Sequence, residues 1–158
     1  TEPRTVSFTK SSGSGDDKSK ERKLETRTEY DDTYGLPKKV EFLGGAGSNT
    51  CTTMEYQHQT DKNLIGLSQQ VLVSPTTCAA AKWTDLTTLS SAVRTAYDGR
   101  AYAAAIPDSA AGRGLASQTF SLKADGTGYQ SDGTTGFDAM GRVTSRTDVD
   151  NKTATITY

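Results

Sequence analysis

Apolar and polar residues alternate over many short stretches of the chain, and this period of two predicts β-strands. Residues 5–9 and 24–30 alternate cleanly, which is typical of strands with one face in water. We expect these two strands to pair as a hairpin across residues 11–23, a Ser-, Gly- and charge-rich stretch whose composition predicts a flexible polar loop. The same alternation predicts further strands at residues 38–43, 51–58, 66–73, 119–123, 142–148 and 152–158.

Residues 83–97 fit two periods. The apolar positions 86, 89, 93 and 96 keep helical spacing, whereas positions 93, 95 and 97 keep strand spacing. The intervening Thr and Ser residues are weak helix formers, and the pattern alone leaves both structures open. Residues 102–116 are rich in Ala and Gly, which predicts irregular structure.

Composition agrees with an all-β fold of repeated hairpins. The chain has 158 residues, of which 33% are hydrophobic, and it contains 15 Gly and 7 Tyr. Thr and Tyr favour half-buried pleated surfaces, and Gly favours turns with positive φ. A thin sheet needs less apolar volume than a helical globule, so a curved sheet is the expected architecture.

Charge and hydropathy exclude two classes of partner. The formal net charge is -1, from 18 basic and 19 acidic residues, and no basic stripe with interleaved aromatics would attract nucleic acid. No stretch reaches the roughly 20 apolar residues that a membrane helix needs. The chain opens without Met or a signal peptide, so we expect residues 1–158 to be one segment truncated at both ends.

Two cysteines, Cys51 and Cys78, could form a single disulfide. A bridge of that spacing would add about 3.5 kcal/mol in the loop-closure model and would indicate an oxidising, extracellular compartment. The alternative is a pair of small buried thiols in a reducing compartment. We favour the disulfide.

A short theme occurs three times: an aromatic residue, an Asp directly after it, and a Gly shortly after that. We expect the aromatic to bury at a strand end, the Asp to accept backbone amides, and the Gly to adopt positive φ. The copies are Tyr30-Asp31 with Gly35, Tyr97-Asp98 with Gly99, and Phe137-Asp138 with Gly141 and Arg142.

These segments resemble the YD repeat of the Rhs and teneurin family, whose pattern is Tyr-Asp-x-x-Gly-Arg-x-Thr. The third copy matches best, with Phe137 in place of Tyr. The first copy has one extra residue before Gly35, and the second is contracted, since Gly99 directly follows Asp98. The segments around and between the copies, with Tyr-Asp-Asp-Thr-Tyr-Gly-Leu-Pro, a Cys-Thr-Thr strand and a second Cys, are similar to an actinobacterial branch of the family.

The resemblance implies a non-catalytic structural segment of a secreted or surface protein. In that family, hairpins wind into a β-shell that encloses a C-terminal toxin domain or acts as a scaffold. Flanking repeats of the same polypeptide, an enclosed toxin domain and self-association through sheet edges are the partners it implies. The resemblance also favours a strand over the second half of residues 83–97.

Candidate chemistry is weak, and no catalytic, cofactor-binding or metal-binding residue is predicted. Alternation would place Cys51 and His58 on opposite faces of a strand, which argues against a nucleophilic dyad. Residues 148–151 carry three oxygen-bearing side chains but lack the Gly and Glu of a calcium loop. The Gly-rich residues 44–49 lack the Lys of a phosphate loop and predict a plain loop. Asp125-Gly126 and Asp132-Gly133 predict turns.

The alternative function is a carbohydrate- or protein-binding adhesion module. Surface Tyr and Trp often form such binding platforms, although ordinary packing on a sheet explains them as well. The candidate residues are Tyr34, Tyr56, Tyr102, Tyr129 and Trp83.

Overall fold

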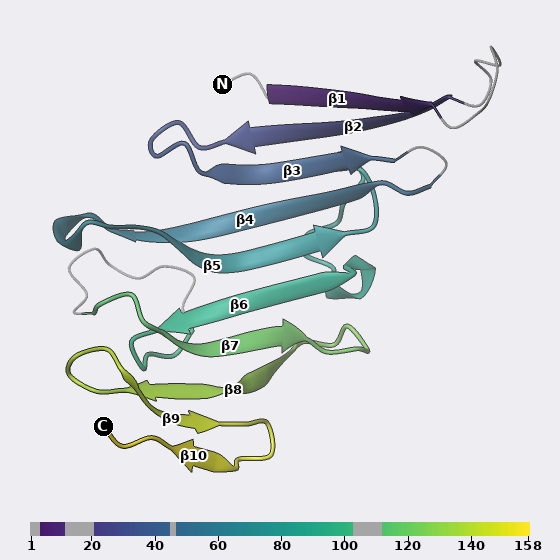
Figure 1. The fold of residues 1–158 in the computed structure, drawn as a ribbon. Helices are drawn as coiled ribbons and strands as arrows, with labels where there is room; N and C mark the ends of the chain where they lie inside the picture. The colour runs from purple at the N-terminus through teal and green to yellow at the C-terminus, as the bar shows by residue number, and fades with distance from the viewer. Residues whose placement is uncertain (1–3, 12–20, 45–46, 103–111) are drawn as a thin grey trace. The chain divides into compact units, whose positions relative to one another are not determined.

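The computed structural model describes residues 4–11, 21–44, 47–102 and 112–158, and nearly all of its regular structure is β-strand. Its strands are antiparallel neighbours in chain order within one open sheet (Figure 1). They are β1 (Arg4–Ser11), β2 (Glu21–Tyr30), β3 (Pro37–Leu43), β4 (Thr50–Gln59), β5 (Leu64–Ser74), β6 (Ser91–Tyr97), β7 (Ala116–Leu122), β8 (Tyr129–Phe137), β9 (Val143–Thr147) and β10 (Thr153–Thr155). The predicted all-β fold is confirmed.

Most predicted strands are present, and the differences lie at their ends. β2 begins at Glu21, so residues 21–23 belong to a strand and not to the predicted loop, while residues 12–20 lie outside the described residues. The ambiguous residues 83–97 contain the short 3-10 helix η3 (Leu86–Thr88) followed by β6. Their second half is therefore a strand, as the resemblance implied.

One predicted turn is wrong. Asp132-Gly133 lies inside β8, where the register shifts: Gln118 pairs with Thr134, but Phe120 pairs with Ser131. Gly133 has a φ of 113°, and a Cβ at this position would collide with the Thr147 carbonyl oxygen. The Asp-Gly pair therefore marks a β-bulge, a role for which Gly is also suited. The other pair forms a turn as predicted, because the Gly126 N–H donates to the Lys123 carbonyl.

The chain divides into two compact units. One comprises Thr1–Met54 and Leu72–Ser90, and the other comprises Glu55–Val71 and Ser91–Tyr158. The strands β4 and β5 each contribute residues to both units. A second short 3-10 helix, η2 (Thr60–Lys62), lies between them in the chain.

In the first unit, β1 to β4 form a meander whose register agrees with the alternation in sequence. Val6 pairs with Thr26, and Thr26 in turn pairs with Phe42. Glu41 pairs with Cys51, which is completely buried. Because side chains alternate between the two faces of a strand, this register sets which residues lie together on each face.

In the second unit, the most buried side chains are small or polar. The buried apolar residues of β6 are Ala92, Ala96 and Tyr97, and the buried polar ones of the unit include Gln59 and Ser117. The Tyr97 hydroxyl donates to the Ser68 carbonyl (2.6 Å), and burial raises the pKa of Tyr97. A buried hydroxyl needs such a partner, so this bond fixes the aromatic ring beside β5.

Candidate functional site

The three aromatic–Asp segments lie at the ends of β2, β6 and β8, where each strand enters the connection to the next. In all three the strand register shifts directly before the aromatic residue: between Glu29 and Tyr30, between Ala96 and Tyr97, and between Gly136 and Phe137. Such a shift leaves one extra residue on the partner strand. The repeat therefore consists of a β-bulge, an aromatic residue and an aspartate, in that order. The expected burial of the aromatic is confirmed for Tyr97 but is wrong for Tyr30, which is 40% exposed, and Phe137 is half-buried.

The turn at Asp138 shows how the aspartate closes the connection. The Asp138 N–H donates to the Arg142 carbonyl oxygen (2.9 Å), and the Arg142 N–H donates back to Asp138 Oδ1 (2.9 Å). Met140 N–H donates to the same oxygen (2.8 Å). One residue thus satisfies three backbone groups that a tight turn would leave without partners.

Asp31 closes its turn with the same two hydrogen bonds. Its N–H donates to the Leu36 carbonyl oxygen (2.8 Å), and the Leu36 N–H donates to Asp31 Oδ2 (2.7 Å). Thr33 and Tyr34 donate their N–H groups to Asp31 Oδ1. The extra residue in this copy is accommodated by one more backbone amide on the carboxylate.

Asp98 closes its connection by hydrogen bonding to Leu115, and the sequence did not predict this pair. Its N–H donates to the Leu115 carbonyl (2.8 Å), and the Leu115 N–H donates to Asp98 Oδ1 (3.1 Å). Arg113 and Gly114 also donate their N–H groups to this carboxylate (3.0 Å each). In this copy the connection is longer and not contracted, because residues 99–114 separate the Asp from its closing residue, whereas only residues 139–141 do so in the third copy.

Gly99 lies elsewhere in that copy. It follows Asp98 in a tight turn in which both residues have positive φ (72° and 57°) and the Arg100 N–H donates to the Tyr97 carbonyl. The Gly99 N–H donates to Ser117 Oγ (2.8 Å). The residue equivalent to Gly35 and Gly141 is Gly114, directly before the closing residue.

A fourth closure occurs at Asp148, between β9 and β10. The Asp148 N–H donates to the Lys152 carbonyl (3.0 Å), and the Lys152 N–H donates to Asp148 Oδ1 (2.9 Å). Here Asn151 stands where the other copies have Gly. This copy has Thr147 in place of the aromatic residue, and no register shift precedes it. The spacing Asp-x-x-Asn-Lys beside Asp-x-x-Gly-Arg is a signal that could have found it.

All four closing residues follow a residue in the left-handed region. The φ values are 68° at Gly35, 71° at Gly114, 83° at Gly141 and 61° at Asn151. Gly adopts this region without steric cost, and Asn is the side chain that tolerates it best. The common conformation explains why these two residue types share the position.

The oxygen-bearing side chains of residues 148–151 serve the turn rather than a cation. Asp148 Oδ1 already accepts the N–H groups of Asp150 and Lys152. Among the described residues, no group of three or more His, Cys, Asp or Glu side chains is arranged to hold a metal ion.

The side chains of two arginines make further hydrogen bonds to the turns of the second unit. Arg113 donates through its terminal nitrogens to the carbonyl oxygens of Ala139 (2.6 Å) and Asp138 (2.7 Å), and so connects the second closure to the third. Arg142 Nε donates to Asp138 Oδ2 (2.7 Å), and its guanidinium lies over the Tyr158 ring at 4.4 Å. The backbone hydrogen bond from Arg142, followed by its side-chain bond, lowers the pKa of Asp138.

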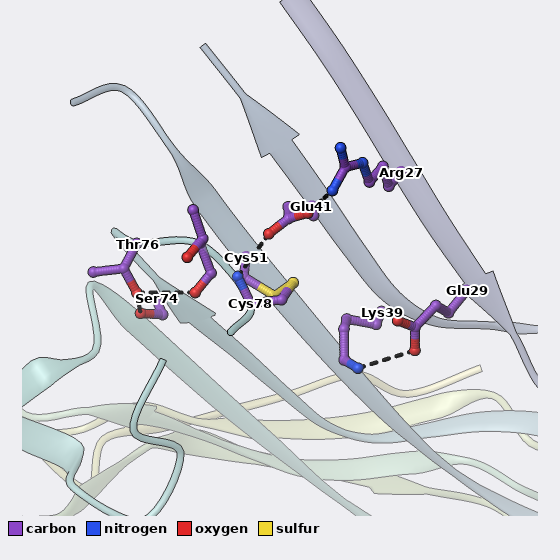
Figure 2. Close-up of a disulfide and its surroundings, with 9 residues drawn as sticks. Arg27, Glu29, Lys39, Glu41, Cys51, Ser74, Thr76 and Cys78 are labelled. Atoms are coloured by element: carbon purple, nitrogen blue, oxygen red, sulfur yellow. Dashed lines mark hydrogen bonds and ion pairs between the residues drawn. A yellow bond between two sulfur atoms is a disulfide. The ribbon is translucent and has the colours of Figure 1, made fainter. Parts of the chain in front are cut away.

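Cys51 and Cys78 form the predicted disulfide, with 5.0 Å between their Cα atoms (Figure 2). The Cys78 N–H donates to Glu41 Oε1 (2.8 Å), and the other oxygen of Glu41 lies 3.5 Å from the Arg27 guanidinium. One carboxylate of β3 thus connects the disulfide segment to β2. Because Cys51 is oxidised, it carries no thiol for a dyad, and His58 Nδ1 accepts the Gly66 N–H.

Two of the candidate platform aromatics pack around Arg94. Its guanidinium carbon lies 4.8 Å from the Tyr102 ring centre and 3.8 Å from that of Tyr129. Arg94 Nε and the Tyr102 hydroxyl both donate to Gln70 Oε1. Of the five candidates only Tyr34 is exposed, at 38%. Tyr102 and Tyr129 therefore pack against Arg94, while Tyr56 and Trp83 are half-buried.

Comparison with known proteins does not assign the chain to a family. No protein-family model, curated protein or solved structure matches the chain. In the part of the chain that the structure describes, no helix is long and apolar enough to cross a membrane.

Proposed function

We propose that the chain is a non-catalytic structural segment of a YD-repeat protein of the Rhs type. Its role is to supply consecutive hairpins to the wall of a β-shell that encloses a toxin domain or serves as a scaffold. A hairpin cannot bury its apolar face alone, so successive repeats stabilise one another as neighbours in a sheet. The flanking repeats of the same polypeptide are its principal partners.

The observation that supports this proposal most strongly is the repeated closure. Asp31, Asp98, Asp138 and Asp148 each make the same reciprocal pair of backbone and side-chain bonds with a closing residue. Three of the four share the aromatic residue and the register shift. A recurrent local geometry with different intervening lengths is typical of a structural repeat and has no counterpart in a single catalytic site.

The disulfide supports a location outside the cytoplasm, because such bonds persist in oxidising compartments. It joins the buried Cys51 to the Cys78 segment within one unit. A secreted or cell-surface protein is therefore the proposed setting.

Electron microscopy of the longest natural polypeptide that contains this sequence tests the proposal. We expect a hollow, closed particle with density inside it, in which this segment forms part of the wall. A rod, a filament or a solid particle would contradict the container role. In that case a scaffold or adhesion role would be preferred, and titration with a glycan array would be the next measurement.

A further inference from the structure

An open cavity of about 540 Å³ lies over β7 to β10, within the second unit. Most of its lining residues are polar, and all of them belong to the described part of the chain. Small-molecule sites are usually concave, have volumes of roughly 300–1,000 Å³ and contain a few convergent polar groups. The cavity therefore has the size and the polarity of a binding site.

The β-bulge in β8 contributes to the shape of this cavity. Gly133 lines it and has a φ of 113°, and a side chain there would collide with the backbone of Thr147. A bulge bends its strand, and β7 and β10 contribute the small residues Ala116 and Ala154 to the lining. The bend and the small residues leave a space that larger side chains would fill.

The strand register places three hydrogen-bonding side chains of the lining on one face of the sheet. Thr135 pairs with Arg146, and Arg146 pairs in turn with Ala154. Lys152 precedes Ala154 by two residues, so alternation places it on the same face. A hydroxyl, a guanidinium and an ammonium group are thus neighbours at the cavity.

The two cations of this group are available to a ligand. Among the described residues, neither Arg146 nor Lys152 forms an ion pair, and the Thr135 hydroxyl forms no hydrogen bond. The two carboxylates that line the cavity already have partners: Asp132 Oδ2 accepts a serine hydroxyl, and Asp148 Oδ1 accepts two backbone N–H groups. The available groups are therefore mainly hydrogen-bond donors with positive charge.

We propose that this cavity binds an acidic saccharide. Arg146 and Lys152 hold its carboxylate, because a guanidinium can donate two parallel hydrogen bonds to that group. The hydroxyls of the lining threonines, Thr135 among them, bond to the ring hydroxyls. No lining residue is aromatic, whereas sites for nucleic acid usually stack the bases on aromatic rings, so a saccharide fits the lining better than a nucleotide does.

This inference goes beyond the structural role and does not depend on it. It uses side chains over the sheet and no backbone group of an edge, so a further strand paired with β10 would leave these side chains in place. A chain that binds no saccharide could still form the wall of a shell. Electron microscopy therefore tests the structural proposal, and titration tests this one.

Titration of the ¹⁵N-labelled 158-residue chain with trigalacturonate, followed by amide chemical shifts, is the first test. We expect the shifts to concentrate in residues 132–135 and 146–154, which line or adjoin the cavity, with a dissociation constant of about 1 mM or lower. The methyl ester of trigalacturonate keeps the ring hydroxyls and removes the charges, and should bind about tenfold more weakly or worse. Inorganic phosphate, an anion without ring hydroxyls, should also bind more weakly.

Variants assign the binding to named side chains. Arg146→Gln combined with Lys152→Gln removes both charges and keeps the backbone closure at Lys152, and we expect it to weaken trigalacturonate binding about tenfold or more. Lys123→Gln removes a cation of the same unit that does not line the cavity, and is the matched control that should bind as the original chain does.

Thr135→Val tests the saccharide part of the inference separately. It keeps the branched shape and removes the hydroxyl, and we expect it to weaken trigalacturonate binding about threefold while leaving phosphate binding unchanged. The amide spectrum of each variant shows directly whether it is folded.

Three results would overturn the inference. The first is the absence of shifts around the cavity at a trigalacturonate concentration about tenfold above the expected dissociation constant. The second is equal binding of the methyl ester or of phosphate, which would indicate a site for any polyol or any anion. The third is a double variant that binds trigalacturonate as tightly as Lys123→Gln does.

Discussion

An aspartate suits these turns because its carboxylate oxygens reach backbone amides only a few residues away. At Asp138 the carboxylate accepts the N–H groups of Met140 and Arg142 while the backbone N–H of the same residue bonds to the Arg142 carbonyl. The side chain acts as an additional peptide carbonyl that is fixed in place. A longer Glu side chain would have to lose more rotamer freedom to make the same bonds.

Replacing Asp98 tests the closure that the sequence did not predict. Asp98→Ala would leave the N–H groups of Arg113, Gly114 and Leu115 without their acceptor, and we expect it to lower the free energy of unfolding by about 2 kcal/mol. Asp98→Asn keeps one carbonyl oxygen and should cost about half as much. Urea unfolding measures both; equal stability of Asp98→Ala and the original chain would contradict the closure.

The Asp138 carboxyl should titrate below the usual range of an aspartate. Hydrogen bonds from Arg142, chiefly through its backbone, lower its pKa in the folded state. A lowered folded-state pKa contributes stability that is present above the unfolded pKa of about 3.9 and is lost as pH falls through the folded pKa. Carboxyl ¹³C chemical shifts measured against pH would show this directly.

Arg142→Ala separates the two contributions of Arg142 to the lowered pKa of Asp138. It removes the Nε donor to Asp138 Oδ2 and keeps the backbone N–H donor. The pKa of Asp138 should therefore rise only part of the way to its usual value. A complete return would show that the guanidinium, and not the backbone, is the main cause.

At the scale of the element, hairpins were predictable where their signals are local. Alternation predicted β2, β3, β4 and β9 because apolar and polar residues follow a period of two along each of them. The period does not by itself identify the buried face, since Phe42 of β3 is 36% exposed and the buried residues of β4 include Gln57 and Gln59. The second half of residues 83–97 could not be assigned from pattern alone. Its strand β6 contains buried Ala92 and Ala96, and Ala carries little preference for a strand.

The candidate site was likewise predictable only where its residues are close together in the sequence. Asp31, Asp98 and Asp138 were identified because aromatic, Asp and Gly are close together in the sequence. Leu115 was not, because its bonds to Asp98 span residues 99–114 and leave no local pattern. Asn151 was not predicted for a different reason: the repeat pattern has Gly at this position, although Asn also tolerates the left-handed conformation.

The disulfide should stabilise the unit that contains β1 to β3. Replacing Cys51 and Cys78 together by Ala removes a bridge that spans 27 residues, and we expect a loss of about 3.5 kcal/mol in the free energy of unfolding. Urea unfolding with and without reductant measures it, with reductant leaving the double variant unchanged. A double variant as stable as the oxidised chain would contradict this.

At the scale of the whole molecule, the sheet is built with few large apolar side chains. Among the described residues, the largest fully buried side chains are those of Cys51, Gln59 and Ser74, so a large part of the cohesion comes from the strand ladders and from polar networks such as that of Gln70. Such a sheet depends on each strand having two neighbours. Its stability should accordingly be lowest at its edges.

Hydrogen exchange should reveal this gradient. Amides of β10 should exchange earlier than those of β8, which has strands on both sides. Mass spectrometry of exchanged peptides gives the comparison. Equal protection of the two strands would show that the edge is covered by something other than β9.

The closure at Asp98 has a consequence for how such chains can change. The bonds between Asp98 and Leu115 repeat those between Asp138 and Arg142, although residues 99–114 separate the first pair and only 139–141 the second. The carboxylate holds both ends of the connection together whatever lies between them. A position of this kind can receive new sequence, such as a binding loop or a whole folded domain, without disturbing the strands on either side. Both evolution and protein engineering can therefore lengthen the chain between Asp98 and Leu115.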